Sequence, residues 1–384
     1  MKQHFFIKRL DIYFIYLAIS LASFTLFWAT NNPTYVLVSR ILLTICIFLF
    51  FTNVFYLAKT NIGKVYITIF IIFGIYYTIF GYSLGNLWLI YKPLLTNIYF
   101  NFLLGFAISY QILRNPDQKI NFYLYSTMIL LIFVAAVILI QEEPYFMVSS
   151  RINLYQTLSD YLLRILIFCT FLTLLKDPSR KSFLLILWTL GLLISLFSGA
   201  KKQLFIEFIM ISYFAISLFQ GAKFLKKSLI TLFAFTGIFF LSFELVQELS
   251  KFEINGINFE RLLETIEVSF FGRVLIIQDN FIRFLDATNF IGNPFIHEVV
   301  GGIYIHSLPL SLITSYGIFF GVLIFSVIFF SIFQTIKTDL HHFLLGISIL
   351  AVSVIATYYD WLVLWYFLGI LCGQTAMNII RNEK

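Results

Sequence analysis

Three groups of residues in this sequence carry side chains that could bind an anion or accept a proton. Arg273 has no acidic residue three or four positions away, so its guanidinium is available to bind an anion. His306 carries an imidazole that can accept a proton near neutral pH, although a lone histidine is often structural. Lys201 and Lys202 add two adjacent positive charges. These residue types predict a site for an anionic group and a candidate base.

Further cations stand in or beside apolar sequence. Arg40 and Arg164 lie inside apolar runs, where a charge is costly and indicates function by default. Arg164 has Asp160 four residues earlier, so a local ion pair explains it equally well. Lys201 and Lys202 follow Ser198-Gly-Ala. They either form an anion site or are two lysines at helix ends whose side chains extend toward water. The functional interpretation of these cations is a site for an anion.

The composition indicates that these residues are carried by a membrane protein. Of the 384 residues, 60% are hydrophobic and only 12% are charged, whereas a soluble domain has roughly 25% charged residues. This excludes an ordinary soluble domain, a disordered chain and a secreted disulfide scaffold. The three cysteines lie in apolar runs and have neither metal-ligand nor disulfide-framework spacing.

Apolar runs between polar breaks predict the elements. Only helices or closed barrels satisfy the backbone in lipid, and these runs show no strand alternation. We therefore expect an all-α fold, a polytopic transmembrane helical bundle of about 12 spans. The expected spans are 11–30, 35–58, 65–83, 94–113, 121–140, 158–175, 182–197, 203–219, 229–247, 307–333, 343–359 and 361–380.

The distribution of Lys and Arg predicts the orientation of the chain. Alternate connections are basic, which places them, with both termini, in the cytoplasm. The net charge of +7 is then accounted for by cytoplasmic anchoring, and nucleic-acid binding loses its support. We expect about nine spans over residues 1–247, a long extracytoplasmic loop over 248–306, and about three spans with a cytoplasmic C-terminus over 307–384.

The expected loop has helical periodicity of its own. Apolar residues recur at helical spacing over 257–270 and 274–285, and 289–294 (NFIGNP) is typical of a turn. The two amphipathic segments predict helices at the outer membrane surface. Arg283 has Asp279 four residues earlier and is expected to form an ion pair on such a helix. The sequence lacks Walker A, HExxH and CxxC motifs, so we predict no metal and no cofactor.

The order of these motifs resembles the superfamily of O-antigen and capsule polysaccharide polymerases and O-antigen ligases. The resemblance rests on Ser198-Gly-Ala-Lys-Lys, on Gly272-Arg273 followed by Ile291-Gly-Asn-Pro, and on His306-Ser followed by Tyr316-Gly-Ile-Phe-Phe-Gly. It covers residues 198–321. Lysines stand where the family often has arginine, and Ser307 stands where asparagine often follows the histidine, so these positions depart from the family pattern.

The resemblance implies a glycosyltransferase of the bacterial inner membrane. Its substrate would be an oligosaccharide linked to undecaprenyl diphosphate, used for lipopolysaccharide or capsule synthesis, with a flippase and a chain-length regulator as partners. The diphosphate would be held by Arg273, Lys201, Lys202, Arg40 and Arg164, with His306 as the base. Two alternatives remain: a ligase of the same superfamily, and a lipid-linked oligosaccharide flippase or other transporter.

Overall fold

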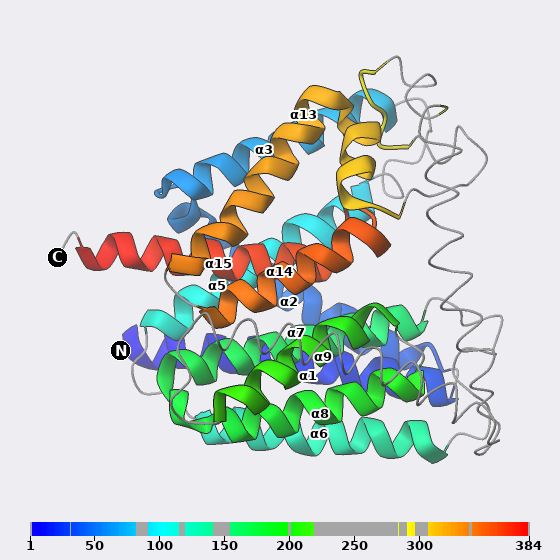
Figure 1. Ribbon diagram of the computed structural model, residues 1–384, viewed down its shortest axis with the longest axis vertical. Coiled ribbons are helices and arrows are strands. Elements are labelled where there is room, and N and C mark those ends of the chain that lie inside the picture. Colours follow the sequence, from blue (N-terminus) through cyan, green and yellow to red (C-terminus); the bar gives the residue numbers. More distant parts are fainter. Residues whose placement is uncertain are drawn as a thin grey trace. The chain divides into compact units, whose positions relative to one another are not determined.

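The structure is a computed structural model that describes residues 2–30, 32–81, 91–114, 120–140, 154–198, 201–218, 283, 290–295, 306–337 and 340–382. The described residues are mostly helical and include no strand (Figure 1). The all-α fold expected from the apolar runs is therefore confirmed for this part of the chain.

The chain divides into two compact units that are each discontinuous in sequence. Unit 1 comprises residues 1–46 and 115–267, and unit 2 comprises residues 47–114 and 268–384. Helix α2 (Thr34–Leu57) contributes its first part to unit 1 and its last part to unit 2. The compact units thus combine distant segments, whereas the predicted division at residues 247 and 306 follows chain order.

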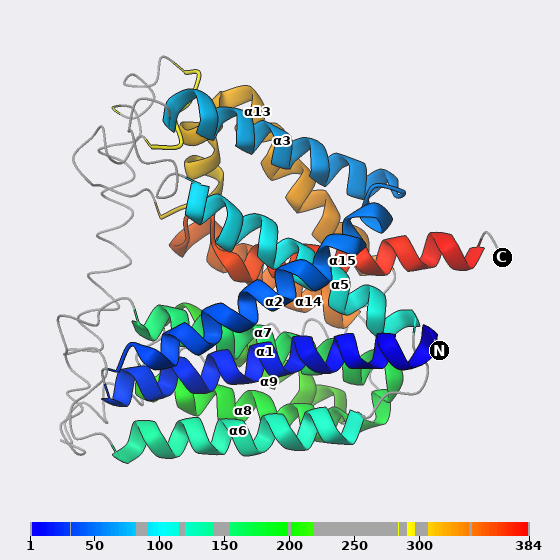
Figure 2. The ribbon, with the colours of Figure 1, turned by 180° about the vertical axis from the view of Figure 1, so that it is seen from behind.

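Besides the first part of α2 and the short 3-10 helix η4 (Pro178–Arg180), unit 1 contains five α-helices among its described residues. They lie side by side in both ribbon views (Figures 1 and 2). Helix α8 packs against α9, α6 and α7, and α1 packs against α7 and α6. The five helices are α1 (Lys2–Thr30), α6 (Ile120–Ile140), α7 (Leu154–Lys176), α8 (Lys181–Ser198) and α9 (Lys201–Leu218).

Helix α7 forms the core of unit 1. Its apolar span is 94% buried, against 33% for the span of its neighbour α6. A helix that is apolar on every side and enclosed by others is a core helix, whereas α6 leaves most of its surface for lipid. A charged residue on α7 is therefore held by protein groups rather than by solvent.

Unit 2 contains the last part of α2 and the helices from both ends of its sequence. Helix α5 packs extensively along α15, and Gly105 and Gly369 lie where the two backbones approach. Small residues allow this close packing in membrane helices. The further elements are α3 (Asn61–Gly81), the π-helix η2 (Leu94–Tyr99), α5 (Phe100–Arg114), α13 (Leu308–Phe333), the 3-10 helix η5 (Gln334–Lys337), α14 (Leu340–Ala356) and α15 (Leu362–Asn382).

Helix α13 is broken, where the apolar run 307–333 predicted one continuous span. Gly317 has φ 78° and ψ 165°, which is incompatible with a helix. The short segment 308–316 and the long segment 318–333 meet at an angle, visible at the gold-coloured top of α13 in Figure 1. We call 308–316 the outer segment, after the side of the membrane that the charge distribution predicts for it. Hydropathy does not detect this break because the apolar run continues, without a charged residue, on both sides of Gly317.

Six described helices are long and apolar enough to cross a membrane, and four shorter apolar helices accompany them. The chain is therefore a helical membrane protein by length and composition of its helices. Described helices coincide with the predicted spans except 229–247, which lies outside the described residues. The count of about 12 spans stays a prediction, as does the loop 248–306, of which 283, 290–295 and 306 are described.

Candidate functional site

Four of the predicted binding residues lie on helices that begin at one end of unit 1. At this end, which we call the cationic end, α1 and α8 terminate and α2, α7 and α9 begin. Lys201 and Lys202 form the first turn of α9. Arg40 lies in the second turn of α2, and Arg164 lies deeper, in the third turn of α7. The side chains of the two lysines are outside the described part of the structure.

Arg164 is enclosed by protein groups. Its side chain is 1% exposed, and its guanidinium carbon lies 4.0 Å from the centroid of the Tyr161 ring. Its Nε donates to the backbone carbonyl of Asp160 over 3.4 Å. The hydroxyl groups of Tyr161 and Tyr16 lie 3.4 Å apart, which connects α7 to α1. A buried cation stacked on an aromatic ring stabilises the packing of α7. The predicted role of Arg164 as a diphosphate ligand stays a prediction.

Asp160 also connects Arg164 to the helix that carries the lysine pair. Its carboxylate accepts a hydrogen bond from the side-chain amide of Gln203 over 3.4 Å. Gln203 is 3% exposed and follows Lys202 directly. The first turn of α9 is therefore attached to the turn of α7 that bears Arg164, although 43 residues separate Asp160 from Gln203.

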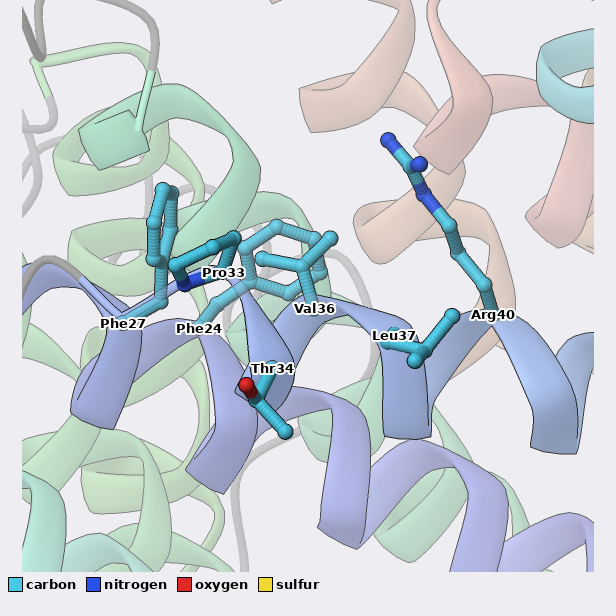
Figure 3. A pocket seen from close by; sticks show the side chains of 7 residues that line it. All are labelled: Phe24, Phe27, Pro33, Thr34, Val36, Leu37 and Arg40. Carbon is cyan, nitrogen blue, oxygen red and sulfur yellow. The ribbon is translucent and has the colours of Figure 1, made fainter.

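Arg40 lines a cavity of about 580 Å³ between α1 and α2. Figure 3 shows the aromatic side chains of α1 and Pro33 on one side, with Arg40 extending from α2 on the other. Among the described residues, Arg40 is exposed and forms no ion pair. An apolar wall beside one available cation suits an amphiphile with an anionic head. The lining residues are Phe24, Phe27, Pro33, Thr34, Val36, Leu37 and Arg40.

Glu207 lies within the core near the cationic end. Its side chain is fully buried, and Ser195 on α8 donates a hydrogen bond to its Oε1 over 2.8 Å. Its other oxygen has no hydrogen-bond partner among the described residues. The described contact of Glu207 is thus with α8, and the suggestion from the sequence that it neutralises Lys201 and Lys202 stays a prediction.

The predicted base belongs to the other unit, and the predicted loop arginine is not among the described residues. His306 is half-buried and stands two residues before α13. Arg273 lies outside the described residues. The structure therefore brings the α2, α7 and α9 cations to one end of unit 1 and places His306 in unit 2.

Two motifs from the sequence meet in unit 2. The backbone N–H of Asn293 donates to the carbonyl of Thr314 over 2.9 Å, and Tyr76 donates to the carbonyl of Ile291 over 3.2 Å. The described residues 290–295, which include 290–294 of the predicted turn 289–294, therefore rest against the break of α13. Gly292 faces Gly317 so closely that an added Cβ would overlap the backbone.

Asp360 and Asn97 form a polar pair that the sequence reasoning missed. Asn97 belongs to the π-helix η2 and donates to Asp360 over 3.1 Å. Beside this pair, the hydroxyl groups of Tyr77 and Tyr359 lie 2.7 Å apart. π-Helices are rare and often found at functional sites. The sequence feature that could have indicated this pair was an acidic residue, Asp360, between two predicted spans. Within the described ranges, no group of three or more His, Cys, Asp or Glu residues could hold a metal ion.

Together these features define a helical membrane protein with a cationic end on one compact unit and a histidine beside a broken helix on the other. Comparison of the sequence with protein-family models and curated proteins, and of the structure with solved structures, finds no match.

Proposed function

We propose that this chain is an oligosaccharide repeat-unit polymerase of the bacterial inner membrane. It transfers a growing glycan from undecaprenyl diphosphate to a new lipid-linked repeat unit at the extracytoplasmic face, in O-antigen or capsule synthesis. The observation that carries the proposal is the gathering of Arg40, Lys201 and Lys202 at one end of unit 1. By the distribution of charge along the sequence this is the extracytoplasmic end, where the rule of positive loops predicts few cations.

The proposed reaction breaks the bond between the anomeric carbon of the donor glycan and the diphosphate oxygen. A hydroxyl of the acceptor sugar forms the new glycosidic bond, and His306 takes the proton of that hydroxyl. Undecaprenyl diphosphate leaves with the electron pair. Arg273, Lys201 and Lys202 stabilise its charge, which a fixed set of cations in a poorly solvated site does strongly.

Arg40 and Arg164 have supporting roles in this proposal. Arg40 is exposed beside apolar side chains, so it suits the boundary between the diphosphate and the lipid tail. Arg164 is buried and adds its charge from within the core. Both chain termini are cytoplasmic in this proposal, and the partners are a flippase that supplies repeat units and a chain-length regulator.

The test is chain lengthening by the purified protein in proteoliposomes with a labelled lipid-linked repeat unit. We expect His306→Ala and Arg273→Ala to abolish products longer than one unit. Arg283→Ala is the matched control from the same loop, because Arg283 is exposed and its predicted partner is a helix-surface acid. Full activity of both variants, or equal loss in the control, would contradict the proposed chemistry.

The acceptor decides between the polymerase and a ligase of the same superfamily. Both use the same donor and leaving group, so the reaction is run with either a second lipid-linked unit or a lipopolysaccharide core. Product on the lipid-linked unit supports the polymerase, and product only on the core identifies a ligase.

One observation favours a transporter as a second candidate. Discontinuous membrane helices such as α13 are common at transporter binding sites. A flippase would move a labelled lipid-linked oligosaccharide across the bilayer without lengthening it. Protection of the label from added reagent in the same proteoliposomes measures that movement, and movement without chain growth would replace the polymerase proposal.

The orientation is tested separately in cells. A cysteine introduced as Glu260→Cys in the predicted extracytoplasmic loop should react with a membrane-impermeant maleimide on intact cells. Labelling only after permeabilisation would show that the loop faces the cytoplasm.

A further inference from the structure

The break in α13 and the turn before it are both held in backbone conformations that few residues adopt. Gly292 has φ 91°, Gly317 has φ 78°, and Phe290, which carries a side chain, has φ 63°. Such conformations persist only where surrounding contacts require them, and they concentrate at functional sites. Two of these residues, Gly292 and Gly317, face each other across segments that are 25 positions apart in sequence.

Backbone contacts fix the outer segment 308–316 against the turn. A Cβ added at Gly317 would lie 2.5 Å from the carbonyl oxygen of Ile291, and one added at Gly292 would overlap Gly317. The Asn293 N–H donates to the carbonyl of Thr314, in the last turn of the outer segment. Since these are backbone atoms, they cannot move aside as a flexible side chain would.

Side chains of the outer segment hold it from the other side. Tyr316 is fully buried and stacks on Phe73 with ring centroids 4.4 Å apart. The hydroxyl groups of Ser315 and Tyr358 lie 3.2 Å apart. The outer segment is thus fixed at its Gly317 end by contacts from α3, from the turn and from the connection before α15.

His306 stands at the opposite end of this segment. Ten residues lie between it and Gly317. The helical residues 308–316 at 1.5 Å each and the extended Ser307 place it about 16 Å from the break. Over that length, a rotation of about 10° at the break moves the far end by about 3 Å. That displacement equals the whole reach of a catalytic hydrogen bond, and a displacement of about 1 Å can cost a hundredfold in rate.

We propose that the contact between Gly292 and Gly317 positions His306, which makes the two glycines positioning residues for the reaction. The inference rests on the proposed function of His306 as the base. The turn sets the angle of the outer segment, and the outer segment sets where the imidazole stands relative to the acceptor hydroxyl. A closely packed backbone pair serves this purpose because it allows a single angle.

The kinetic test uses Gly317→Ala and Gly292→Ala in the proteoliposome assay. We expect kcat to fall about a hundredfold, with KM for the lipid-linked substrate within about twofold of wild type. Free imidazole should restore part of the activity of His306→Ala, and adding either glycine change should not lower that restored rate, because the free base does not depend on where residue 306 stands. A further loss of the same size in the double variants would show that the glycines act independently of His306 and would overturn the inference.

Gly105→Ala is the matched control for backbone overlap. It also introduces a clash with a facing backbone in unit 2, but at the packing of α5 on α15. It should lower stability while leaving kcat per folded protein close to wild type. If Gly105→Ala lowered kcat as much as Gly317→Ala, the effect would be general and the inference would fail.

A distance measurement tests the positioning without any activity. Spin labels at positions 310 and 330 report the angle between the two segments of α13, and we expect Gly317→Ala to shift their mean distance by about 3 Å or to broaden it. If the glycine variants do not accumulate in cells, Tyr76→Phe is measured in their place, because it removes only the hydrogen bond from the Tyr76 hydroxyl to the carbonyl of Ile291. It should broaden the same distribution. An unchanged distance overturns the inference. A changed distance with an active His306→Ala protein would instead refute the proposed function.

Discussion

The side-chain amide of Gln203 on α9 donates a hydrogen bond to the carboxylate of Asp160 on α7, with nitrogen and oxygen 3.4 Å apart. The backbone carbonyl of Asp160 accepts from Arg164. One residue of α7 therefore contacts both the buried arginine and the helix that begins with the lysine pair. Through this contact the core of unit 1 determines where the first turn of α9 lies.

Replacing Gln203 with Leu should destabilise the protein by about 1–3 kcal/mol, because it removes a hydrogen bond to a carboxylate in a poorly solvated place. The thermal unfolding midpoint in detergent measures this. Thr189→Ala is the control, since Thr189 is exposed and, among the described residues, bonds only to a carbonyl of its own helix. Its change should stay within about 0.5 kcal/mol. Equal changes of the unfolding midpoint in the two variants would show that the hydrogen bond between Gln203 and Asp160 does not contribute measurably to stability.

The two arginines of unit 1 should respond differently to removal. Arg164→Met should lower the unfolding midpoint, because Tyr161 loses a stacked cation that contributes about 2 kcal/mol when desolvated. Arg40→Met should leave the midpoint unchanged and raise KM for the lipid-linked donor several-fold. Unfolding scans and initial rates measured on the same preparations separate the two effects. An Arg164→Met protein as stable as wild type would contradict the structural role of Arg164, and an unaltered KM for Arg40→Met would contradict donor binding by Arg40.

The Ser195–Glu207 contact predicts a contrast between two conservative variants. Ser195→Ala leaves the buried Oε1 of Glu207 without its donor, which should cost about 1–3 kcal/mol of unfolding free energy. Glu207→Gln keeps a carbonyl oxygen for Ser195 and supplies an amide, so it should be neutral or stabilising. Denaturant titration in mixed micelles compares them. A destabilised Glu207→Gln would indicate that the carboxyl group itself is needed.

Gly105→Ala should destabilise unit 2 by about 1–3 kcal/mol, the usual cost of overpacking. The added methyl group would overlap the carbonyl of Tyr366 on α15. Gly74→Ala provides the comparison, since a Cβ added at Gly74 would meet the Tyr99 hydroxyl at an ordinary 3.5 Å. That variant should be neutral or slightly stabilising because alanine favours the helix. Retention of the wild-type midpoint by Gly105→Ala would show that α5 and α15 can separate without cost.

The hydrogen bonds of the Asp177 carboxyl group predict a small dependence of the protein's stability on pH. Hydrogen bonds from Ser179 and Arg180 hold the pKa of this carboxyl group below its usual range. Its contribution is therefore present above the unfolded-state pKa and is lost as the pH falls through the folded-state pKa. Asp177→Asn should lower the unfolding midpoint slightly at pH 7, and the difference from wild type should vanish in acid. A difference that grows in acid would contradict this sign.

Most helices could be predicted from the sequence because a membrane span depends on a local property. Twenty apolar residues without a charge satisfy their own backbone as a helix, whatever surrounds them. The predicted runs 121–140 and 182–197 match α6 and α8 to within about one residue at each end. The cations were visible for the same reason, since a charge stands out in an apolar run.

The tertiary structure decided which of these segments meet. The sequence indicates an arginine at 164 but not that Tyr161 and Asp160 contact it. It indicates a glycine at 317 but not that the helix is broken there or that Gly292 packs against the break. In the sequence Asp360 is an isolated acidic residue, and only the fold shows that Asn97 donates a hydrogen bond to it. Hydropathy depends on neighbours along the chain, whereas burial, pairing and a helix break depend on residues brought together from distant segments. This is why the class of protein followed from the sequence, and the arrangement of its polar groups only from the fold.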